Sequence, residues 1–146
     1  MQIHNETNNE NRPPPRPRLS ILIADDDVDT VLTLAELLRD EGHIVHTCAN
    51  ANLVVGAIQR YQPDICLLDI VMPTKTGFTI AREVLAMNLQ QRPVLVAISG
   101  VFNSKSDEVV ATSAGFDHFV RKGADPSELL RLINAYVGSP ASPAAA

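Results

Sequence analysis

The chain has 146 residues and 45% hydrophobic side chains, enough for one domain with a substantial core, and that core is aliphatic because aromatic residues make up only 4%. Its net charge of -5 argues against general binding to nucleic acids or to membrane surfaces. No apolar run approaches the ~20 residues that cross a bilayer, and the N-terminus lacks the pattern of a signal peptide. These features predict a cytoplasmic protein.

Residues 1–18 and 139–146 are predicted to be disordered tails on either side of one domain at 19–138. The first tail is rich in asparagine and then, in the stretch RPPPRPR at 12–18, in proline and arginine, so it cannot bury enough apolar surface to fold alone. The proline-rich stretch is expected to be an extended, polyproline-like chain. It is either a solvated tail or a ligand for a partner or an anionic surface.

Between the tails, apolar strand patterns alternate with helical patterns. Strands are predicted at residues 19–24, 43–48, 64–69, 93–99 and 116–120. Helices are predicted over 28–38, over 54–61, around 81–85, over 104–114 and over 126–137. This alternation implies parallel strands joined by right-handed crossovers. The predicted fold is therefore α/β, a flavodoxin-like (βα)5 doubly wound parallel sheet with strand order 2-1-3-4-5.

Chemically active side chains follow these strands, at the edge where ligand sites form in doubly wound sheets. Asp25 and Asp26 follow the first strand, Asp69 ends the third, Ser99 ends the fourth, and Lys122 follows the fifth. Clustered carboxylates repel one another and normally require a cation or a partner. Two carboxylates can hold Mg²⁺, a third can attack phosphorus, and a lysine and a hydroxyl can bind phosphoryl oxygens. The set predicts phosphoryl transfer to a carboxylate.

Four stretches, ILIADDD, PDICLLDIVMPTKTG, VLVAISG and DHFVRKGADPSELL, resemble the receiver domain of two-component response regulators. The resemblance covers roughly residues 19–138. It implies that Asp69, which opens the pattern D-x-x-M-P-x-x-x-G, is the phosphoacceptor. It also implies that Mg²⁺ is held by Asp25, Asp26, Asp69 and the backbone carbonyl of Val71.

The same resemblance implies roles for three further residues. Ser99 and Lys122 would contact the phosphoryl group, and Ser99 and Phe119 would form a conformational switch. The implied phosphate donor is a histidine kinase or a phosphotransfer protein that carries phosphohistidine. One position departs from the family, because Lys122 is followed by Gly123 where proline, often after a cis bond, is usual. Without proline a cis bond costs about 3–4 kcal/mol, so a trans or strained bond is expected.

The expected function is a signalling switch rather than an enzyme, catalysing only its own phosphotransfer and dephosphorylation. No DNA-binding domain is expected, because the chain ends soon after the last predicted helix. The domain then acts as a stand-alone regulator, by docking a partner or relaying phosphate, or as a fragment of a larger protein. The alternative is a non-phosphorylated interaction module, a pseudo-receiver. A metal-dependent phosphatase would require a second acid two residues after the nucleophile, where Val71 stands.

A rival pattern overlaps the first acids. Asp25, Asp27, Asp29 and Glu36 have the spacing of an EF-hand calcium loop, but position 6 of that loop should be glycine and is Thr30. The simpler interpretation of Asp27 is an N-cap for the first helix, with a role in the acid site as the alternative.

Overall fold

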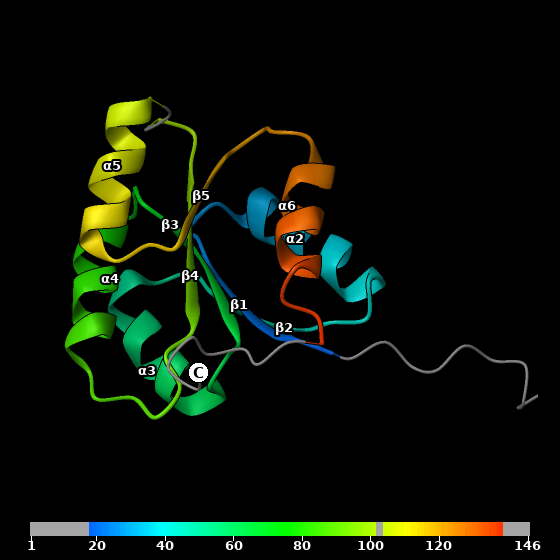
Figure 1. Ribbon diagram of the computed structural model, residues 1–146, viewed down its shortest axis with the longest axis horizontal. Coiled ribbons are helices and arrows are strands. Elements are labelled where there is room, and N and C mark those ends of the chain that lie inside the picture. Colours follow the sequence, from blue (N-terminus) through cyan, green and yellow to red (C-terminus); the bar gives the residue numbers. More distant parts are fainter. Residues whose placement is uncertain (1–17, 102–103, 139–146) are drawn as a thin grey trace, which may run out of the picture.

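The computed structural model describes residues 18–101 and 104–138, so both predicted tails, apart from Arg18, lie outside the described residues (Figure 1). Five parallel strands form one sheet in the order β2-β1-β3-β4-β5, which confirms the predicted topology. The strands are β1 (Ser20–Ala24), β2 (Ile44–Cys48), β3 (Ile65–Asp69), β4 (Val94–Ser99) and β5 (His118–Arg121).

Helices cover both faces of the sheet. In order along the chain they are α2 (Val28–Asp40), the short 3-10 helix η1 (Ala51–Leu53), α3 (Val54–Tyr61), α4 (Gly77–Ala86), α5 (Lys105–Ala114) and α6 (Pro126–Asn134). Figure 1 shows α2 and α6 on one face and α3, α4 and α5 on the other. None of the helices in the described ranges combines the length and the apolar character that a membrane span requires.

The central strands are buried on both faces, as their continuous apolar runs predict. Alternate residues of β1 enter the two layers of core: Leu22 and Ala24 pack under α3, α4 and α5, while Ile21 and Ile23 pack under α2 and α6. The sheet is therefore a rigid frame that fixes the position of whatever follows each strand.

Two helix boundaries differ from the sequence prediction by more than two residues. The helix predicted around 81–85 begins earlier, at Gly77, because the side chain of Thr76 caps it by accepting from the Thr79 amide. The last helix ends at Asn134 rather than at 137, and the residues that follow form turns. Neither difference moves a residue of the predicted acid site.

His43 fixes the start of β1. It is buried, and its Nδ1 accepts a hydrogen bond of 3.3 Å from the backbone N–H of Leu19, so this nitrogen carries no proton. Burial lowers the pKa of His43, against the opposing effect of the Glu41 charge.

Mild acid is expected to weaken the fold at this point. Because folding lowers the pKa of His43, the unfolded chain binds the proton first as the pH falls. The contribution of neutral His43 to the free energy of unfolding is therefore complete above the usual pKa of 6.5 and is lost below it. Urea unfolding between pH 7 and about pH 5 should show a larger decline for the wild type than for His43→Asn. Equal declines would contradict this role.

Candidate functional site

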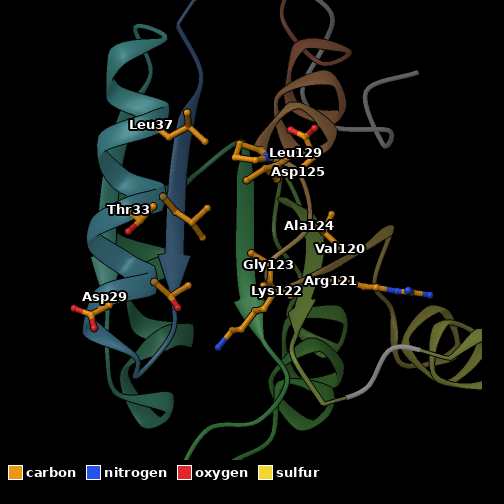
Figure 2. Close-up of a pocket in the computed structure, with 14 residues that line it drawn as sticks. Asp29, Thr33, Leu37, Val120, Arg121, Lys122, Gly123, Ala124, Asp125 and Leu129 are labelled. Atoms are coloured by element: carbon orange, nitrogen blue, oxygen red, sulfur yellow. The ribbon is translucent and has the colours of Figure 1, made fainter.

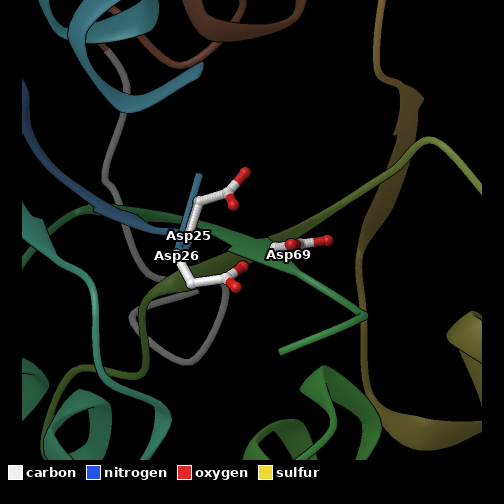
Figure 3. Close-up of side chains that lie close together, drawn as sticks. All are labelled: Asp25, Asp26 and Asp69. Atoms are coloured by element: carbon white, nitrogen blue, oxygen red, sulfur yellow. The ribbon is translucent and has the colours of Figure 1, made fainter. Parts of the chain in front are cut away.

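Three carboxylates gather at the carboxyl ends of β1 and β3 (Figure 3). Asp25 and Asp26 follow β1 and Asp69 ends β3, and one oxygen from each lies within 4.8 Å of the others. They meet because β1 and β3 are neighbouring strands in register. Asp25 and Asp69 are buried, whereas Asp26 is exposed. The structure thus brings together the three acids that the sequence singled out.

Lys122 lies between two of these acids. Its Nζ is 2.9 Å from Asp25 Oδ2 and donates a hydrogen bond of 3.2 Å to Asp69 Oδ2. Burial alone would lower the pKa of Lys122, but the close contacts with the carboxylates of Asp25 and Asp69 outweigh it and raise the pKa. The lysine is therefore a permanent cation inside the site.

One ammonium does not balance three carboxylates. Burial and the nearby charge of Asp25 raise the pKa of Asp69 from 3.8 to about 6, although Lys122 and the Val71 amide oppose this shift. Asp25 Oδ2 is buried and makes an ion pair with Lys122 but no hydrogen bond. An all-oxygen donor set with surplus negative charge and an under-coordinated buried oxygen fits a hard divalent cation such as Mg²⁺.

The backbone around Lys122 explains the departure from the family pattern. The Lys122–Gly123 bond is trans, as expected, and there is no cis bond anywhere in the described part of the chain. Gly123 has φ +81°, a conformation that proline, held at about -65°, cannot adopt. The Lys122 N–H also donates to the Ser99 carbonyl at 2.9 Å. Lys122 thus contacts both acids with glycine in the place of the usual proline.

The remaining predicted residues lie on β4, on β5 and directly after β3. Ser99 is fully buried at the end of β4, on the strand next to Asp69, and its Oγ accepts from the Val101 amide at 3.2 Å. The Val71 amide donates to Asp69 Oδ1 at 3.2 Å. Phe119, on β5, is half-buried against the core beneath α3, α4 and α5. The predicted switch pair thus occupies adjacent strands.

Asp27 is the N-cap of α2, since its side chain accepts from the Asp29 amide and from the Thr30 hydroxyl. This confirms the simpler interpretation. Because α2 begins at Val28, Asp29 and Glu36 are helical residues, and the calcium-loop pattern is a coincidence of spacing.

Gly77 supports Asp69 in a way that the motif spacing alone did not reveal. A Cβ at this position would lie 2.6 Å from the carbonyl oxygen of Asp69 and 2.8 Å from Cα of Ile70. The Gly77 N–H also donates to the Ile70 carbonyl at 2.8 Å. The start of α4 therefore packs directly on the backbone of Asp69, and only glycine fits between them. The signal in the sequence was the closing glycine of D-x-x-M-P-x-x-x-G.

The fold and the site define a flavodoxin-like domain with an acidic site where the strand order reverses, between β1 and β3. Residues 21–134 match the family model of the response regulator receiver domain. The chain therefore belongs to the receiver domains of two-component response regulators, as the resemblance indicated.

Two curated relatives match this chain over most of their own length. An uncharacterized 14.6 kDa protein from Leptolyngbya boryana is 31% identical over 119 residues, covering 82% of this chain and 90% of the relative. Protein PilH of Pseudomonas aeruginosa is 31% identical over 115 residues, covering 79% of this chain and 94% of PilH.

Solved structures support the fold. The BeF3-activated receiver domain of Klebsiella pneumoniae RstA has a TM-score of 0.73 at 23% identity, covering 80% of this chain and 96% of that domain. Vibrio cholerae chemotaxis protein CheY4 has a TM-score of 0.74 at 20% identity, covering 81% of this chain and 98% of CheY4.

Proposed function

We propose that this receiver domain accepts a phosphoryl group on Asp69 from the phosphohistidine of a histidine kinase or phosphotransfer protein, in the cytoplasm. The observation that supports this most strongly is the surroundings of Asp69. It is 3% exposed, lies 3.2 Å from Lys122 Nζ, and shares a cluster of oxygens with Asp25 and Asp26. A buried carboxylate beside a fixed cation and a cation-binding oxygen set suits phosphoryl transfer better than simple structural pairing.

In the proposed reaction an Asp69 oxygen bonds to phosphorus while the P–N bond of phosphohistidine breaks. The bonding electrons return to the imidazole nitrogen. Lys122 then binds a phosphoryl oxygen through the ammonium that now contacts Asp69, and the Ser99 hydroxyl binds another. Asp25, Asp26, Asp69 and the Val71 carbonyl would hold Mg²⁺, which supplies charge for the equatorial oxygens when it is bound.

The switch follows from the same contacts. Movement of Ser99 toward the phosphoryl group would shift the end of β4 and give Phe119 room to move inward. Helix α5 follows β4 and buries only Ala111 and Ala114, while Val109 and Val110 are exposed. An element with so few buried contacts changes position at low cost. We infer that phosphorylation biases an existing two-state equilibrium of the α5–β5–α6 face, which binds the partner.

The missing proline after Lys122 is the feature that favours the pseudo-receiver alternative. Against that alternative, Lys122 contacts both Asp25 and Asp69 with glycine in that place.

Phosphorylation by a small P–N donor tests the proposal without a cognate kinase. With phosphoramidate and Mg²⁺, mass spectrometry of the wild type should locate one phosphoryl group on Asp69. Asp69→Asn should take up none, and Asp26→Asn should react much more slowly. The control Asp40→Asn, an exposed acid at the end of α2, should match the wild type. Modification of another residue, or undiminished uptake by Asp69→Asn, would refute the assignment.

A long-lived phosphoryl group is also expected. Val71 and Val101 each stand two residues after a site residue, and both have exposed side chains, 48% and 72% respectively. Branched apolar groups at these places exclude water and cannot orient it for attack. Val101→Ala is therefore expected to shorten the lifetime several-fold, followed as loss of phosphate from the purified domain. Prompt loss from the wild type that is slowed by Val101→Ala would contradict this.

A further inference from the structure

A groove of about 330 Å³ lies between α2 and α6 and ends at Lys122 (Figure 2). Its walls are largely apolar. Figure 2 shows Leu37 of α2 and Leu129 of α6 on opposite sides of the gap, with Val120 of β5 between the helices and the site. The reaction proposed above makes no use of this groove, apart from the lysine at its end.

The rim of the groove is acidic. Two exposed acids, Asp29 and Asp125, line it. The lining also has two cations, but Lys122 is paired with Asp25 and Asp69, and Arg121 extends away from the groove in Figure 2. Along α2, Glu36 and Asp40 follow Asp29 at spacings of seven and eleven residues, which 3.6 residues per turn bring to one side of the helix. At ~1.5 Å per residue, Asp29 and Asp40 are about 16 Å apart along the helix axis. A row of negative charge thus runs along α2 and meets the groove at Asp29.

We propose that residues 12–18 of the same chain, RPPPRPR, dock in this groove as a polyproline strap. This segment joins the domain at Leu19, which is buried in the core layer beneath α2 and α6. The N–H of Leu19 is bound to His43, three residues beyond Asp40. The segment therefore starts at the Asp40 end of α2. At ~3.1 Å per residue its seven residues extend about 20 Å, enough to reach Asp29.

The chemistry of the segment matches both features of the groove. Arg12, Arg16 and Arg18 supply three positive charges with no acid among them. Polyproline has three residues per turn, so Arg12 and Arg18 lie on one side, about 19 Å apart, close to the separation of Asp29 and Asp40. The proline rings between them provide apolar surface for the leucine walls. A preformed polyproline helix loses little conformational entropy on docking.

Proline replacement in the full-length chain tests the strap. The first variant carries serine in place of the four prolines of the segment, Pro13, Pro14, Pro15 and Pro17. Its ¹H–¹⁵N signals should shift at Thr33, Leu37 and Leu129, because the groove becomes empty. The control carries serine at Pro140 and Pro143, the same chemical change in the other tail, and should leave these signals unchanged. A synthetic peptide of residues 12–18 added to the first variant should restore them. Unchanged groove signals in the first variant, or equal shifts in both, would overturn the proposal.

Charge variants and dilution test the acidic rim and the source of the strap. Arg12→Glu should produce part of the same shifts, and Asp29→Lys added to it should reverse them. Arg82→Glu, the same charge change at an exposed position on α4, should not affect the groove.

Signals of the wild type should be independent of concentration, because the strap belongs to the same molecule. Loss of the docked signals on dilution would assign the groove to a second copy and overturn the proposal.

Discussion

Asparagine in place of Asp69 is expected to stabilise the domain while it abolishes phosphorylation. Burial and the charge of Asp25 raise the pKa of Asp69 to about 6, so at neutral pH the folded state holds an ionised carboxylate in an unfavourable place. Asparagine has nearly the same shape and no charge. Urea unfolding at pH 7 in metal-free buffer should give a free energy of unfolding higher by on the order of 2 kcal/mol.

The dependence of this gain on pH identifies its cause. A raised carboxyl pKa means that the folded wild type binds its proton before the unfolded chain does as the pH falls. The gain of Asp69→Asn should therefore be complete above about pH 6 and vanish toward the usual pKa of 3.8. Asp40→Asn, which replaces an exposed carboxyl, is the control and should change stability little. A destabilised Asp69→Asn variant, or a gain that does not vary with pH, would contradict the electrostatic account.

Alanine in place of Gly77 is expected to damage both the fold and the site. The new Cβ would lie 2.6 Å from the Asp69 carbonyl oxygen and 2.8 Å from Cα of Ile70, and neither backbone atom can rotate away. The cost should be roughly 1–3 kcal/mol of unfolding free energy, as for other overpacked sites. Because the displaced segment carries Asp69, phosphorylation by phosphoramidate should also slow.

Gly56 provides a matched control for Gly77. It lies inside α3, and a Cβ there would meet nothing within 4 Å. Gly56→Ala should therefore raise the free energy of unfolding by about 0.5–1 kcal/mol, through the better helix propensity of alanine, and leave the rate of phosphorylation unchanged. Similar effects of the two substitutions would show that Gly77 has no special relation to Asp69.

The sheet and the position of the acids could be predicted because the signals are local and strong. Strands such as β3 are continuous apolar runs up to a final polar residue, and alternation with helices predicts parallel order. Once the order is known, residues that follow β1 and β3 must lie at one edge of the sheet, so Asp25, Asp26 and Asp69 converge.

Other features depend on backbone geometry and packing that no local pattern encodes. The positive φ of Gly123 and the two contacts of Lys122 are properties of the folded backbone, and the tight fit of Gly77 depends on how α4 packs on β3. The early start of α4 comes from the hydroxyl cap at Thr76, which an apolar pattern does not register. The acids along α2 are visible in the sequence, but the groove beside them exists only because α6 packs next to that helix.

Asp69 is expected to receive the phosphoryl group only when Mg²⁺ is bound beside it. Beryllofluoride, which mimics a phosphoryl group on a carboxylate, tests this directly in an NMR titration of the full-length chain. Saturable changes are expected that require Mg²⁺, centre on Asp69, extend to Ser99 and Lys122, and are absent from Asp69→Asn. Changes without Mg²⁺, changes centred elsewhere, or an unaltered response of Asp69→Asn would contradict this expectation.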